Sequence, residues 1–203
     1  MKTWFQRLFG AKATHPAITI VSGLPRSGTS MMMRMLEAGG LPPLTDHQRT
    51  ADMDNPQGYY EFEQVKQLDR GDTAWLATAS GHAVKVISML LQHLPATHHY
   101  KVIFVERHLT EVLASQRKML AHRNEDTEAA NDAELTALFQ KHLVAIRHWL
   151  AQQPNFEVLY IHYSDLLREP EAQAAQVNQF LGGGLDVPKM ATVVDPNLYR
   201  NRV

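Results

Sequence analysis

The sequence of 203 residues lacks cysteine altogether. This absence excludes disulfide bonds, catalysis by a thiol and metal sites built on cysteine, and it is compatible with a reducing compartment. The chain also lacks an excess of charge of either sign, since 20 Lys and Arg residues stand against 21 Asp and Glu residues, for a formal net charge of −1. A balanced chain generates no overall field that would attract nucleic acid or an anionic membrane. We therefore expect no nucleic-acid partner, and any anion-binding site must be local.

Long apolar runs are absent as well. No stretch approaches the roughly 20 residues that a membrane-spanning helix needs. Residues 1–13 carry aromatic side chains between Lys and Arg, but their apolar run is too short and too interrupted for a signal peptide. This segment is interpreted as a first helix that packs on the domain, with an amphipathic helix that touches a membrane or a partner as the alternative. We expect a cytoplasmic protein without an integral membrane segment, in an oligomeric state that the sequence leaves open.

Short β-branched runs alternate with helical patterns along the chain. Strands are expected at residues 17–22, 83–87, 101–105 and 158–161. Helices are expected from residue 31 to 36 and over 110–122, 132–153 and 171–181. This alternation predicts an α/β fold: a three-layer αβα sandwich with a central parallel sheet, like that of the P-loop nucleoside triphosphate hydrolases. With 44% apolar residues the chain can form a real core, and we expect one domain over residues 1–203.

The segment Gly23–Ser30 joins the first expected strand to the first expected helix. Gly28 allows a close turn, so that successive backbone N–H groups and the positive end of the helix can face one anion. Arg26 adds a planar fork of hydrogen-bond donors. Three hydroxyl side chains complete the loop, at Ser27, Thr29 and Ser30. The segment therefore predicts a phosphate-binding loop, and an ordinary strand-to-helix turn with a capping hydroxyl is the alternative.

The loop differs from the phosphate loop of kinases at one position. That loop reads G-x-x-x-x-G-K-[ST], and here Thr29 stands where the lysine belongs. The lysine neutralises the terminal phosphates of a triphosphate, so its absence counts against hydrolysis of ATP or GTP. The histidines of the chain show no HExxH or other metal-binding spacing, and no carboxylate cluster suited to Mg²⁺ is evident. We expect no metal.

Three segments, taken together, resemble the sulfotransferase family. The loop sequence P-R-S-G-T-S after a first strand is similar to the family's 5′-phosphosulfate loop. The sequence F-V-E-R-H, which ends at His108, leads into a helix that bears Ser115, and this resembles the arginine and serine that hold the donor's 3′-phosphate. Residues 159–167, followed by 180–182, resemble the late tyrosine–acidic–leucine segment and closing helix. The resemblance spans residues 17 to 182 in the family's order.

The resemblance implies a sulfuryl donor, 3′-phosphoadenosine-5′-phosphosulfate (PAPS), and a small-molecule or glycan acceptor that offers a hydroxyl or an amine. It places Arg26 and residues 27–30 at the 5′-phosphosulfate, where charge develops on the bridging oxygen and must be met by fixed donors. It places Arg107 and Ser115 at the 3′-phosphate. Lys85 corresponds to a lysine that contacts the transferring group in many relatives.

The match is incomplete at the catalytic base. The aryl-type enzymes carry a histidine two residues after the lysine, and here that position is Ile87, which cannot take a proton. They also stack adenine on a tryptophan where this chain has Met31. Other branches use a glutamate that follows the first helix, and the corresponding candidates here are Glu61, our first choice, and Glu63. A glutamate can serve as base, although glutamates at a helix start are common for electrostatic reasons alone.

Other positions admit an ordinary structural role beside the functional one. Lys85 could run its stem along the strand and surface at its end, and Arg107 could form a salt bridge at the end of its strand. Tyr163 belongs to the nucleotide site by resemblance. The family's glycine-rich basic loop is missing near the C-terminus, where Arg200 and Arg202 are the candidate replacements at the 3′-phosphate and a frayed cationic tail is the alternative.

Two other functions compete with a sulfotransferase. One is a P-loop nucleotide kinase or NTPase, in which Phe104–Glu106 would be the apolar strand and acid that hold Mg²⁺. The other is a nucleotide-binding module without activity, which the isoleucine at position 87 permits. The acceptor itself is not predicted, because residues 45–80, where we expect substrate choice to be made, contain no recognisable motif.

Overall fold

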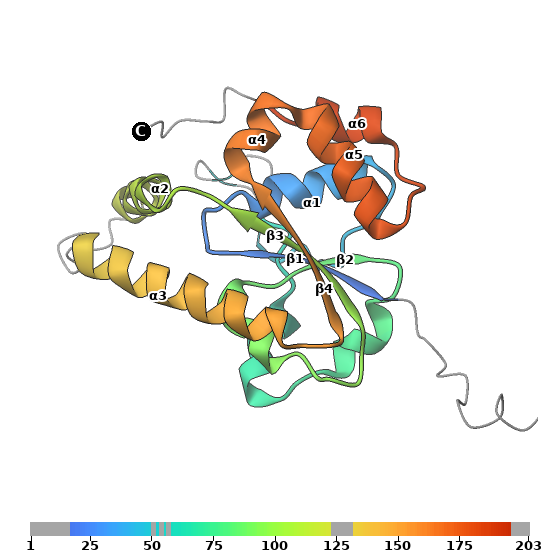
Figure 1. Cartoon of the computed structure of the whole chain (residues 1–203), viewed down its shortest axis with the longest axis horizontal. Helices are drawn as coiled ribbons and strands as arrows, with labels where there is room; N and C mark the ends of the chain where they lie inside the picture. The colour runs from blue at the N-terminus through green and yellow to red at the C-terminus, as the bar shows by residue number, and fades with distance from the viewer. Residues whose placement is uncertain (1–16, 50–51, 53–54, 56–57, 123–131, 196–203) are drawn as a thin grey trace, which may run out of the picture.

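The computed structural model describes residues 17–49, 52, 55, 58–122 and 132–195. The predicted helix within residues 1–13 and the candidates Arg200 and Arg202 lie outside the described residues. The four strands form one sheet in the order β2-β1-β3-β4, with every neighbouring pair parallel (Figure 1). Their bounds are β1 Ile18–Gly23, β2 Ala83–Lys85, β3 Tyr100–Glu106 and β4 Phe156–His162. The predicted parallel sheet is thus confirmed.

Helices cover both faces of this sheet. The α-helices are α1 Thr29–Ala38, α2 Leu109–His122, α3 Asp132–Ala151, α4 Tyr163–Arg168, α5 Pro170–Leu181 and α6 Val187–Thr192. Three 3₁₀-helices are η2 Glu63–Arg70, η3 Ala74–Thr78 and η4 Ser88–His93. Figure 1 shows α1, α5 and α6 on one side of the sheet and α3 on the other. This arrangement is the predicted three-layer sandwich.

Alternating side chains of the central strands divide the core into two halves. Val21 and Ile103 belong to the half beneath α1, α5 and α6. Ile20 and Val102, one residue earlier on each strand, belong to the half that η2, η3, η4 and α3 cover. Both halves are dry, with all four side chains fully buried. Successive residues of a strand point to opposite faces, so an uninterrupted apolar strand is what a sheet covered on both sides requires.

The elements that sequence periodicity missed are the short ones. The helices α4 and α6 have six residues each, and the 3₁₀-helices have five to eight. An element of one or two turns shows too few repeats to reveal a period. The long predicted helices are present, with ends that differ by a few residues. No helix of the described residues is long and apolar enough to cross a membrane, and whether the chain is cytoplasmic stays a prediction.

The register places the carboxyl ends of the strands at one edge of the sheet. Val21 pairs with both Lys85 and Ile103, and Gly23 pairs with Val105. The loop after β1, the end of β2 and the start of α2 therefore meet at this edge. Parallel α/β sheets bind their ligands outside the carboxyl ends of the strands.

Candidate functional site

The predicted phosphate loop connects β1 to α1, and two glycines give it its shape. Gly23 has φ 150°, and a Cβ there would lie 2.4 Å from the carbonyl oxygen of Val105. Gly28 has φ 108°, and a Cβ there would lie 2.4 Å from the ring of Tyr163. Gly28 is also the N-cap of α1, and no side chain caps that helix among the described residues. The loop is therefore pressed between β3 and Tyr163, with the positive end of α1 left for an anion.

Arg26 joins the loop to the helix α2. Its φ of 70° lies in the left-handed region, which is strained for a residue with a Cβ and is often found at functional sites. Its Nε donates a hydrogen bond of 2.9 Å to Oγ of Ser115 on α2. Its carbonyl oxygen accepts a hydrogen bond of 3.2 Å from Nη1 of Arg107. Arg26, Arg107 and Ser115, which lie far apart in the sequence, thus form one cluster.

Arg107 is held inside the protein by two further contacts. Its Nε lies 2.8 Å from Oε2 of Glu111, and both side chains are less than one tenth exposed. Its guanidinium lies 4.3 Å from the centroid of the Tyr163 ring, close enough for a cation–π contact. Arg107 therefore does form a salt bridge at the end of its strand, which was the alternative to a functional role. This salt bridge holds the guanidinium beside the backbone of Arg26, whose side chain bonds to Ser115.

The hydroxyls of the loop are not equivalent. Ser27 is buried, and its Oγ lies 2.5 Å from the place where a Cβ of Gly23 would stand, so this hydroxyl is turned towards the floor of the loop. It has no hydrogen-bond partner among the described residues. Thr29 is also buried. Ser30 Oγ instead accepts hydrogen bonds of 3.1 Å from both Asn55 Nδ2 and Lys85 Nζ. Ser30 therefore connects α1 to the other half of the site.

Lys85, at the end of β2, is partly buried and bonds inside the protein. Its Nζ donates to Ser30 Oγ and, at 2.8 Å, to the carbonyl oxygen of Tyr59. The pKa of Lys85 is lowered to about 8, chiefly by burial; Glu61 opposes this lowering, and the charges of Arg49 and Arg26 contribute to it. The ammonium is thus held beside the start of α1.

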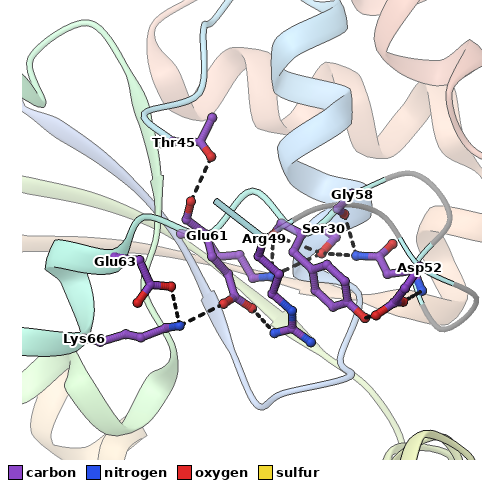
Figure 2. Close-up of polar contacts among 11 residues, drawn as sticks. Ser30, Thr45, Arg49, Asp52, Gly58, Glu61, Glu63 and Lys66 are labelled. Carbon is purple, nitrogen blue, oxygen red and sulfur yellow. Dashed lines mark hydrogen bonds and ion pairs between the residues drawn. The ribbon is translucent and has the colours of Figure 1, made fainter. Parts of the chain in front are cut away.

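Glu61, unlike Glu63, is brought to this side of the site. Figure 2 shows Glu61 between Arg49 and Lys66, with distances of 2.5 Å from Oε1 to Arg49 Nη1 and 3.3 Å from Oε2 to Lys66 Nζ. Thr45 Oγ1 donates to the backbone carbonyl of Glu61 at 2.8 Å. Glu63 begins η2, is more exposed and pairs with Lys66. It matches the alternative in which a glutamate stands at a helix start for electrostatic reasons alone. Of the two glutamates, only Glu61 is near enough to raise the pKa of Lys85.

The segment after α1 contributes side chains that no motif predicted. Tyr59 is buried, and its hydroxyl donates to the carboxylate of Asp52 at 2.7 Å. The guanidinium carbon of Arg49 lies 3.4 Å from the centroid of the Tyr59 ring. Asn55 Nδ2 bonds to the carbonyl oxygen of Gly58 as well as to the serine of α1. The one signal in the sequence was that Arg49 is the only Lys or Arg between residues 45 and 58.

The position two residues after Lys85 carries no base. Ile87 precedes η4 and is 38% exposed, which is unusual for a large apolar side chain in this structure. Within the described residues, no three His, Asp or Glu side chains are grouped as metal ligands.

Known proteins resemble the chain in sequence and in fold. A family model described as "Sulfotransferase domain" matches residues 16–199. Mouse sulfotransferase SULT7A1, solved in complex with PAP, shares 18% identity and a TM-score of 0.52; the match covers 89% of this chain and 63% of that one. Sulfotransferase STF1 of Mycobacterium tuberculosis H37Rv shares 14% identity and a TM-score of 0.56, over 93% of this chain and 74% of that one. A sulfotransferase of Alicyclobacillus acidocaldarius shares 14% identity and a TM-score of 0.51, over 90% and 87%.

No curated protein matches the chain. The solved structures, all below 25% identity, support the fold, and the family model carries the assignment. Sulfotransferases use PAPS as the sulfuryl donor, as the resemblance implied. The prediction that the chain is a member of the sulfotransferase family is confirmed. The comparisons do not favour a kinase or NTPase. The chain belongs to the sulfotransferase family.

Proposed function

We propose that this protein transfers a sulfuryl group from PAPS to a hydroxyl or amine of a small-molecule or glycan acceptor. The observation that carries the proposal is the enclosed ammonium of Lys85, hydrogen-bonded to Ser30 at the start of α1. A cation fixed beside a phosphate-type loop that lacks the kinase lysine suits a sulfuryl group better than a triphosphate.

The donor would lie along the edge of the sheet with its two phosphates on different elements. Backbone N–H groups of residues 27–30 and the side chain of Arg26 would meet the 5′-phosphosulfate. Arg107 and Ser115 would meet the 3′-phosphate. The hydrogen bond from Arg26 to Ser115 supports two adjoining subsites. Arg200 remains a candidate for the second subsite.

The proposed chemistry breaks the S–O bond to the donor and forms a new S–O or S–N bond to the acceptor. The acceptor oxygen or nitrogen attacks the sulfur, and the bond between sulfur and the bridging oxygen of the donor breaks. The electron pair of that bond stays on the 5′-phosphate of the leaving nucleotide, 3′-phosphoadenosine-5′-phosphate (PAP). Lys85 and Arg26 stabilise the charge that develops there. Glu61 takes the proton that the acceptor loses, provided that its carboxylate is released from its cation partners.

Thermal melting with and without nucleotide tests the binding half of this proposal. PAP should raise the melting temperature in the absence of Mg²⁺, because ligand binding to the folded state stabilises it. ATP should give no comparable shift, with or without Mg²⁺. Tight ATP binding that depends on Mg²⁺ would refute the proposal and favour a kinase.

A turnover assay tests the other half. Labelled PAPS is offered with panels of alcohols, phenols, amines and simple glycans, and label transfer is measured. Transfer to any acceptor supports an enzyme. Strong binding of PAP without transfer across the panels would favour the nucleotide-binding module that Ile87 permits.

A further inference from the structure

Arg49 lies inside the site although the family resemblance assigned it no role. It comes from the segment between α1 and η2, and its Nη1 lies 2.5 Å from Oε1 of Glu61. Its side chain is 32% exposed, against 50% for Lys66, the other cation partner of the same carboxylate. Arg49 is therefore the more enclosed of the two cations that hold Glu61 (Figure 2).

The orientation of Arg49 is set by Tyr59. The guanidinium lies on the Tyr59 ring, and the ring is held by the bond from its hydroxyl to Asp52. The backbone carbonyl oxygen of the same tyrosine accepts the hydrogen bond from Lys85. One buried residue thus carries Arg49 on its ring and the Lys85 ammonium on its backbone. A stacked guanidinium is pre-oriented, so it loses little conformational freedom when it binds a further anion.

Charged side chains gather around this point. Arg49 and Arg26 both act on the ammonium of Lys85 and disfavour its charged form, while Glu61 favours it. Asp52, bonded to the Tyr59 hydroxyl, is a second carboxylate near Arg49. An anion placed among Arg49, Arg26 and Lys85 would be attracted by all three cations.

We propose that Arg49 is a third cation of the sulfuryl site, which binds the sulfuryl oxygens of PAPS in exchange for its bond to Glu61. The inference rests on the proposed function. Arg49 contacts Glu61 directly, and Tyr59 connects Arg49 to Lys85. In this proposal the sulfuryl group passes beside these side chains. The planar fork of Arg49 can bond two oxygens at once. A bound donor would also leave Glu61 with Lys66 as the one remaining cation of the two that hold it.

The comparison of PAPS with PAP isolates this contact, because PAP lacks only the sulfuryl group. Dissociation constants of both ligands are measured by titration calorimetry for the wild type, Arg49→Met, Arg49→Lys and the matched control Lys66→Met. Arg49→Met should weaken the affinity for PAPS about 10- to 100-fold, the loss expected for a charge-assisted contact. The affinity for PAP should change about twofold or less. Arg49→Lys should recover part of the PAPS affinity. Lys66→Met should not change the ratio of the two constants.

The other outcomes overturn the inference in distinguishable ways. Equal losses for PAPS and PAP in Arg49→Met would mean that Arg49 serves the nucleotide or the fold. Unchanged affinity for both ligands would mean that Arg49 only positions Glu61. If Arg49→Met fails to fold, Arg49→Lys decides. A complete loss of the affinity difference between PAPS and PAP in Arg49→Lys, or no change in that difference, would contradict a charge contact of this kind. A wild type that binds neither ligand would instead refute the proposed function itself.

Discussion

Lys85 carries a charge that should respond to donor binding near neutral pH. Burial lowers its pKa to about 8 in the free protein. An anion beside an ammonium favours the charged form, and an opposite charge at hydrogen-bonding distance raises a pKa by about 1 to 3 units. Binding of PAPS should therefore be accompanied by uptake of a proton at Lys85. The affinity is at its full value below the pKa of the free protein and falls as the pH rises through it.

The size of the effect follows from the same pKa. At pH 8 about half of the Lys85 side chains are neutral, so binding should take up about half a proton per site. At pH 7 about nine tenths are already charged, and the uptake should be small. If binding raises the pKa by about 2 units, the affinity for PAPS should fall about tenfold between pH 7 and pH 9.

Titration calorimetry at pH 8 in buffers of different ionisation enthalpy measures the proton uptake directly. The control is Lys85→Arg, because a guanidinium stays charged over this range and cannot take up a proton on binding. We expect uptake in the wild type and its loss in the variant, even if the variant binds more weakly. The same uptake in both proteins, or none in the wild type, would refute the assignment of Lys85 to the sulfuryl site.

The remaining predictions concern the loop and the base. Arg26→Ala and Ser115→Ala should each weaken PAP, and because the two side chains share a hydrogen bond, a double-mutant cycle measured by titration should show a coupling energy of about 0.5–3 kcal/mol; additive losses would contradict a shared contact. Glu61→Gln should leave PAP affinity unchanged within about twofold and lower turnover of labelled donor about 10²–10⁴-fold, whereas normal turnover would place the base elsewhere. Gly28→Ala should abolish PAP binding and lower the melting temperature, because its Cβ would lie 2.4 Å from a ring carbon at a φ of 108°. The control Gly184→Ala, with φ 93° and no atom within 4 Å of the added Cβ, should bind PAP normally and lose only about 1 kcal/mol for the left-handed backbone.

The sequence alone determined the fold class, the position of the phosphate loop and the family. These depend on local patterns, since a buried strand, a turn glycine and a long helix each leave a signature within a few residues. The pairing of Arg107 with α2 was visible for the same reason, because Ser115 follows it by eight residues across one strand-to-helix turn.

Only the tertiary structure decided which side chains share the site. Glu61 and Glu63 are two residues apart and have the same side chain, yet only Glu61 lies beside Lys85. Arg49 stands in a segment without any motif, and its neighbours Asn55 and Tyr59 are held beside the start of α1 by hydrogen bonds to Ser30 and from Lys85. The path of such a segment depends on contacts between residues distant in sequence, which no local periodicity records. The sequence therefore determined the family and the place of the loop after β1, and contacts between residues distant in sequence determined which charged side chains gather beside that loop.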